Sequence, residues 1–294
     1  MGRPQPYAQV GEFVEAKPAQ PAGLASPIAL SFPLWIYPQI LSLDAPAIAV
    51  AWQWMFAKTF HVLLNSAMLF VTAACVWMIY AADHLLDVRG GAIYSSRHRF
   101  MAQHSRALVG TALIVFAGAA MGARRFPFAI WLGAIELTVV VGVYLGIVHV
   151  LGDRVRRYWP KEFVIGAVFA AGSSLATWTS PAERVWPAVL LFAALCTLNC
   201  CAADYWEWQA NSVLLRYPHR MTRMVARHFG WFAGALLIAG SAAFAFTHSN
   251  IALATALSTV LLIALNSRRR SLSHELVRLL ADAALLTPLL FLLR

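Results

Sequence analysis

Charged residues are scarce in this sequence. Asp, Glu, Lys and Arg together make up 12% of the 294 residues, whereas hydrophobic residues make up 60%. A soluble domain would be about one quarter charged. Apolar runs of roughly 20 residues, long enough for a helix to cross a bilayer, recur along the chain without the period-two alternation of membrane β-strands. The composition therefore excludes a soluble globular domain and predicts an all-α fold, a polytopic membrane helix bundle.

Cysteine is also scarce. The four Cys residues lie inside apolar segments and lack the paired spacing of a zinc site. They are Cys75, Cys196, Cys200 and Cys201. We interpret them as small packing residues of the helix bundle.

A signal-peptide pattern is absent as well. Residues 1–23 are polar and contain four prolines, without a basic stretch followed by an apolar core. We interpret them as a flexible cytoplasmic tail. Residues 24–294 are predicted to form a single transmembrane helical domain with two related halves, at about 24–151 and 163–294.

What the sequence does contain is a series of apolar segments that predicts about nine membrane spans. The predicted spans are 27–57, 61–86, 107–123, 126–151, 163–180, 186–206, 229–247, 250–266 and 276–293. The first is irregular because Pro27, Pro33, Pro38 and Pro46 interrupt it. It is either one kinked span or a half-helix followed by a short span.

Positive charge is unevenly distributed between the two sides of these spans. Sixteen of the 23 Lys and Arg residues fall in or beside the loops after the second, fourth, sixth and eighth spans. Cytoplasmic loops carry an excess of Lys and Arg. The pattern therefore predicts a multi-pass protein of a bacterial-type inner (plasma) membrane with its N-terminus cytoplasmic and its C-terminus outside. Two helices in the first segment would move the N-terminus outside. The net charge of +10 follows from this topology, and no nucleic-acid partner is predicted.

Two carboxylates, Asp83 and Asp87, stand where a long uncharged segment meets an Arg-rich loop. Residues 59–82 contain no Asp, Glu, Lys or Arg. A spacing of four places both carboxylates on one helix face, where they repel each other. They also lie at the C-terminal end of the helix, which disfavours anions. The arrangement needs a cation. Bound magnesium is one candidate, and the alternative is a salt-bridged helix end in which Asp87 pairs with Arg89 or Arg97.

A second polar array stands at the corresponding end of the sixth predicted span. Asn199, Ala203 and Glu207 have the same 0, 4, 8 spacing as the first array, which begins at Ile79. Asp204 adjoins them. In a regular helix it would point about 100° away from their stripe, so it would join them only if the helix unwinds.

With these two arrays the chain resembles the UbiA superfamily of intramembrane prenyltransferases. That family has nine helices, an Asn/Asp-x-x-x-Asp-x-x-x-Asp motif after the second helix and another Asp-rich motif after the sixth. Residues 158–161, Tyr-Trp-Pro-Lys, resemble the Tyr…Lys element that members carry before the fifth helix. The resemblance covers most of the chain. It implies Mg²⁺-dependent transfer of a prenyl group from a prenyl diphosphate to an aromatic or lipid acceptor.

The resemblance also implies roles for individual residues. Those implied to be catalytic are Asp83, Asp87 and Lys161. Those implied to bind Mg²⁺ are Asp83, Asp87, Asn199, Asp204 and Glu207. Those implied to bind substrate are Arg97, Arg99, Tyr158 and Asn199. The cations would stabilise the charge that develops on the departing diphosphate. The partners would be the prenyl diphosphate, a hydrophobic acceptor and the lipid bilayer, with other membrane proteins as further candidates.

The sequence departs from the family pattern in both arrays. Ile79 replaces the usual Asn or Asp, and Ala203 replaces the central carboxylate, so fewer charges remain to bind magnesium. A second hypothesis is therefore a catalytically degenerate UbiA-like membrane protein that binds a lipid, quinone or pigment, or acts in complex assembly.

Two further acids, Glu136 and Asp282, lie at membrane depth within predicted spans. Ionisable groups there are costly and indicate function by default. A third hypothesis is a transporter in which they form a proton or ion path. The alternative is a protonated or hydrogen-bonded carboxyl that faces the bundle interior.

Overall fold

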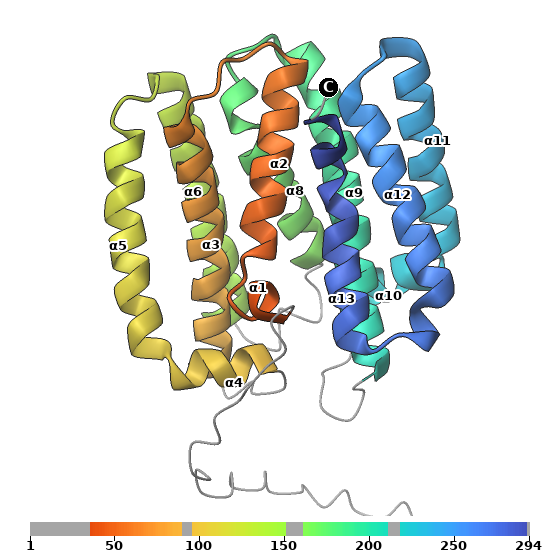
Figure 1. The fold of residues 1–294 in the computed structure, drawn as a ribbon, viewed down its shortest axis with the longest axis horizontal. Coiled ribbons are helices and arrows are strands. Elements are labelled where there is room, and N and C mark those ends of the chain that lie inside the picture. The colour runs from red at the N-terminus through yellow and green to blue at the C-terminus, as the bar shows by residue number, and fades with distance from the viewer. Residues whose placement is uncertain (1–35, 90–95, 151–160, 211–217, 293–294) are drawn as a thin grey trace, which may run out of the picture. The chain divides into compact units, whose positions relative to one another are not determined.

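The structure, a computed structural model, describes residues 36–89, 96–150, 161–210 and 218–292. Within these ranges every regular element is helical and no β-strand occurs, which confirms the all-α prediction for the described residues. The predicted tail at 1–23 lies outside them. In Figure 1, α3 and α9 both end at the lower edge of the bundle, where α13 begins.

The helices fall on either side of the gap at 151–160. Those before it are α1 (Tyr37–Ile40), α2 (Asp44–Thr59), α3 (Ser66–Arg89), α4 (Ser96–Gln103), α5 (Ser105–Ala123) and α6 (Phe128–Val150). Those after it are α8 (Lys161–Ser174), η2 (Leu175–Thr177), α9 (Ala182–Ala210), α10 (Arg220–Arg227), α11 (Phe229–Thr247), α12 (Asn250–Arg268), η3 (Arg269–Ser271), α13 (His274–Ala283) and η4 (Ala284–Phe291).

The first predicted span is irregular in its described part. The four residues of α1 are separated from α2 by a break at which Ser42 adopts a left-handed backbone (φ 53°). The predicted interruption of 27–57 is thus present, but the choice between one kinked span and two segments depends on residues outside the described ranges.

Among the described residues, six helices are long and apolar enough to cross a membrane, and they indicate a membrane-embedded protein. They are α3, α5, α6, α9, α11 and α12. They coincide with six of the nine predicted spans.

The other three predicted spans fall on α2, α8 and α13, which have 16, 14 and 10 residues. The segments of α8 and α13 continue as the 3₁₀ helices η2 and η4. Pro288 lies within η4 and has no N–H to donate to an α-helical partner. The prediction of nine spans is therefore confirmed for six helices only.

The interior of the bundle is built around α2, α9 and η4. The Trp52 ring stacks on Phe192 with centroids 3.9 Å apart, and its indole N–H donates to the Leu285 carbonyl at 2.8 Å. Trp52 and Phe192 are fully buried. A buried indole needs such an acceptor, so this contact fixes α2 between α9 and η4.

Several helices turn large apolar side chains outward. Only 17% of the most apolar stretch of α3, α5 and α6 is buried, against 50% for α9 and α12. Exposed examples are Ile114 and Phe116 on α5, Val143 on α6, and Ile238 and Phe246 on α11. Apolar surface on this scale is unusual for a soluble monomer and suits contact with lipid.

Candidate functional site

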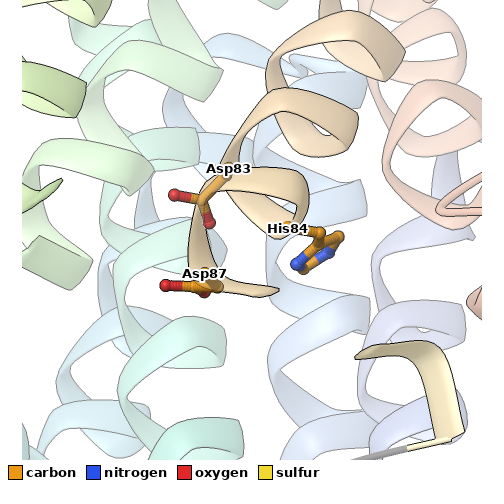
Figure 2. A group of neighbouring side chains, drawn as sticks. All are labelled: Asp83, His84 and Asp87. Carbon is orange, nitrogen blue, oxygen red and sulfur yellow. The ribbon is translucent and has the colours of Figure 1, made fainter. Parts of the chain in front are cut away.

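The carboxylate pair lies in the last two turns of α3. Asp83, His84 and Asp87 each offer a ligand atom within 4.8 Å of the others. Figure 2 shows the two carboxylates one helical turn apart, with the imidazole of His84 beside them. The side chains of Asp83 and Asp87 are about one-third and one-quarter exposed, so solvent or a ligand can reach them.

The last turn of α6 supplies a histidine to this pair. Nε2 of His149 lies 3.0 Å from Oδ1 of Asp83, and its Nδ1 lies 3.9 Å from Oδ1 of Asp87. Sequence reasoning missed His149. The available signal was its position at the end of a predicted span that finishes on the same side as the pair. His84, the neighbour of Asp83 on α3, is buried and packs edge-on against Tyr80.

Lys161, the first residue of α8, stands near both arrays. Its Nζ lies 3.7 Å from Oδ1 of Asp204 on α9. The negative charge of Asp204, with smaller contributions from Glu162 and Asp83, raises the pKa of Lys161 above its usual value despite burial. The ammonium therefore stays charged, in the field of one carboxylate from each array.

The stripe of the second array faces α13. Asn199 Nδ2 donates to Oδ1 of Asp282 at 3.5 Å, and Glu207 forms an ion pair with Arg278. Asp204 points toward α8, as expected for a residue about 100° from the stripe. The unwinding that would let Asp204 join the stripe does not occur, because α9 is continuous from Ala182 to Ala210.

Other polar side chains interact electrostatically with residues of α9 and α13. Tyr80, three residues before Asp83 on α3, is in the electrostatic field of Asp282 and Asp44. Cys200 on α9 is in the field of Asp282 and of Lys161. Polar groups from α2, α3, α8, α9 and α13 therefore share one region of the bundle.

A buried hydrogen bond holds the start of α8. The Thr222 hydroxyl on α10 donates to Oε2 of Glu162 at 2.7 Å, and both side chains are almost fully buried. One turn further, α8 approaches α9 closely: a Cβ at Gly166 would lie 2.4 Å from Oγ1 of Thr197. These two contacts fix the position of Lys161 relative to α9. Neither Glu162 nor Thr222 was predicted from sequence.

The first array fits a magnesium ion better than the second. Asp83 and Asp87 offer close, partly exposed carboxylate oxygens, the ligands that Mg²⁺ prefers. Glu207 and Asp204 each already have a cationic neighbour, Arg278 and Lys161 respectively. The donor set thus suits one ion at the end of α3, and a second ion would have to displace those cations.

Two of the predicted substrate-binding residues fall beyond what the structure describes. Tyr158 lies in the gap at 151–160, and the side chain of Arg97 is likewise not described. Arg99 is exposed on α4. The role of these three residues in substrate binding remains a prediction.

The two acids at membrane depth differ. Asp282 is partly buried and accepts the hydrogen bond from Asn199, which fits the interpretation of a bonded carboxyl facing the interior. Glu136 is exposed on α6, so the same interpretation is wrong for it. With one acid inside and one outside, the arrangement gives no support to a shared ion path.

No family model, curated protein or solved structure matches this chain.

Proposed function

We propose that the protein is a UbiA-like intramembrane prenyltransferase that moves a prenyl group from a prenyl diphosphate to an aromatic or lipid acceptor with the help of Mg²⁺. The position of Lys161 carries the proposal. Its ammonium lies beside Asp204 of the second array and in the field of Asp83 of the first. A cation beside one array and within electrostatic range of the other suits a diphosphate bound through both metal and ammonium.

Each residue then has a chemical task. Bound magnesium would offset the charge of the diphosphate. Asp83 and Asp87 would hold it, and His149 would orient Asp83. Lys161 contacts a phosphate oxygen while Asp204 keeps the ammonium in place. The allylic C–O bond breaks with its electron pair on the diphosphate, and an electron pair of the acceptor forms the new bond to the prenyl carbon. The proton that the acceptor loses passes to the released diphosphate or to water.

We also propose the full nine-span topology. The short helices α2, α8 and α13 would be the additional spans, with protein rather than lipid around much of their surface. The Lys- and Arg-rich loops would face the cytoplasm of a bacterial-type cell. This orientation would put the N-terminus inside and the C-terminus outside, and it would open the site toward the cytoplasm.

The test uses the purified full chain in detergent with prenyl diphosphates of several chain lengths, with Mg²⁺ or with EDTA. We expect Mg²⁺-dependent binding that is lost in Asp83→Asn and Asp87→Asn and weakened in Lys161→Met. Glu275→Gln, a neutralised acid in the first turn of α13, is the matched control and should bind as wild type does. Wild-type binding and turnover by both Asp variants would refute the proposal.

The ion pair of Glu207 with Arg278 favours a second candidate, a degenerate UbiA-like protein that binds a lipid, quinone or pigment or acts in complex assembly. This ion pair neutralises Glu207, and Ala203 stands where a carboxylate would be, so the second array has little negative charge left to bind magnesium. This candidate predicts binding of an uncharged isoprenoid quinone without Mg²⁺ and without turnover. Detection of prenyl transfer to any acceptor would exclude it.

A further inference from the structure

A pocket of about 370 Å³ lies where α9 ends, between η3 and the start of α13. We call it the basic pocket, because its wall contains Arg269, Arg270, Arg278 and His274. Among its described lining residues the one acid, Glu207, is already paired with Arg278. The pocket opens on the side of α9 that faces α13, whereas Asp204 faces Lys161 on α8.

One arginine of the basic pocket is held in place by its neighbours. Nη1 of Arg269 donates to Oε1 of Gln209 at 2.7 Å, and its guanidinium carbon lies 5.7 Å from the ring centre of Trp206. Both contacts leave the guanidinium positively charged, since an amide and an aromatic ring neutralise nothing. Fixing such a side chain in advance lowers the entropic cost of binding an anion.

The next arginine adds a second charge beside the first. Arg270 is exposed, and among the described residues it has no hydrogen bond or ion pair. It is close enough to Arg269 for the two like charges to act on each other. Two adjacent guanidinium groups repel each other, and an anion bound to both removes that repulsion. Planar guanidinium groups match the oxygens of a phosphate particularly well.

The remaining wall of the basic pocket is apolar. Trp206, Leu272 and Val277 line it together with the methyl groups of alanines on α9. The pocket lies at the ends of two helices that are long and apolar enough to cross a membrane, α9 and α12. In a membrane that these helices cross, lipid phosphates would lie near the helix ends, and basic pockets between transmembrane helices bind anionic head groups.

We propose that the basic pocket binds a phosphate group through Arg269 and Arg270, and that the phosphate belongs to an anionic phospholipid whose glycerol and upper acyl chain contact the apolar wall. The proposal is independent of prenyl transfer, because it uses neither the carboxylate pair nor Lys161. A soluble phosphate compound would supply the same recognition chemistry, so the test separates the two sources.

The experiment measures lipid binding to the purified full chain in detergent by native mass spectrometry. Phosphatidylglycerol is titrated, phosphatidylcholine serves as the neutral-headgroup comparison, and inorganic phosphate serves as a competitor. We expect phosphatidylglycerol to bind more tightly than phosphatidylcholine. Arg270→Gln should weaken phosphatidylglycerol binding about fivefold, and Arg269→Gln with Arg270→Gln more than about tenfold.

Arg268→Gln is the matched control, because Arg268 is exposed, adjacent in sequence and absent from the pocket wall. It removes the same charge and should leave binding unchanged. Melting temperatures of the lipid-free variants verify that all are folded. The proposal would be overturned if Arg268→Gln and Arg270→Gln lost phosphatidylglycerol binding equally. It would also be overturned if both lipids bound equally and inorganic phosphate did not compete with either.

Inorganic phosphate decides the source of the ligand. Retained preference for phosphatidylglycerol at millimolar phosphate supports the lipid as the occupant. If phosphate instead displaces the lipid from the wild type, and does so less in Arg270→Gln, the pocket is a phosphate site. Its ligand is then a soluble phosphate compound and the lipid assignment is wrong.

Discussion

Nε2 of His149 lies 3.0 Å from Oδ1 of Asp83 and joins the last turn of α6 to the end of α3. The same ring presents Nδ1 to Asp87 at 3.9 Å. One imidazole therefore faces both carboxylates, from a helix that otherwise consists almost entirely of apolar residues. A histidine in that position can fix the orientation of Asp83 and leave the second oxygen of the carboxylate for a ligand.

The first prediction concerns this histidine. Replacing it, in His149→Ala, should weaken Mg²⁺-dependent binding of prenyl diphosphate by roughly 10- to 100-fold, the usual cost of losing a group that orients a metal ligand. The measurement is a Mg²⁺ titration at fixed prenyl diphosphate, which separates loss of metal affinity from loss of substrate affinity. His149→Gln retains a hydrogen-bond donor and should restore part of the affinity.

A distant histidine serves as the control for this prediction. His248 ends α11 in the left-handed conformation (φ 50°) and is exposed. Asn tolerates that conformation, so His248→Asn should bind magnesium and substrate as the wild type does. Unchanged Mg²⁺ affinity in His149→Ala would show that the imidazole does not position Asp83.

The second prediction concerns the buried hydrogen bond between Thr222 and Glu162. Thr222→Val keeps the shape of the side chain but leaves the Glu162 carboxylate without this donor. Loss of the donor should lower the free energy of unfolding by about 1 to 3 kcal/mol. Thr222→Ser retains the hydroxyl and is the matched control. Thermal unfolding in detergent measures both, and equal melting temperatures for the Val and Ser variants would contradict the prediction.

The sequence predicted where the site residues lie along their helices better than it predicted which side chains of other helices they contact. The position of Asp83 and Asp87 at the end of α3 followed from an uncharged run and a spacing of four. The six long apolar helices were also found from their composition. These features depend on consecutive residues, so a single segment of sequence is enough to predict them.

The partners of the site residues were not predictable in the same way. The contact of Asp83 with His149, and the contact of Glu207 with Arg278, each join residues on different helices. Spacing within α9 showed that Asn199 and Glu207 share a stripe and that Asp204 does not. It could not show that the stripe faces α13 and Asp204 faces α8, because that depends on how whole helices pack.

The third prediction tests the close approach of α8 and α9. Gly166→Ala would bring a Cβ within 2.4 Å of the Thr197 hydroxyl and 2.8 Å of the Thr197 backbone nitrogen. The helices must separate, so we expect a lower melting temperature together with weaker diphosphate binding through displaced Lys161. Gly172→Ala on the same helix is the control, since a Cβ there meets nothing within 4 Å. A control variant that is destabilised as much as Gly166→Ala would show that helix contact is not the cause.

The fourth prediction concerns Glu136, an exposed acid in the middle of the apolar helix α6. An acid facing lipid at that depth costs about 2 to 3 kcal/mol. If this face contacts lipid, Glu136→Leu removes the cost and should raise the melting temperature of the protein in lipid nanodiscs. Thr138→Leu is the control for added apolar surface. The Thr138 hydroxyl is already bonded to the Ala134 carbonyl at 2.7 Å, so its removal should change stability little. A lower melting temperature for Glu136→Leu would mean that the carboxyl makes a favourable contact with protein, and that lipid does not cover this face of α6.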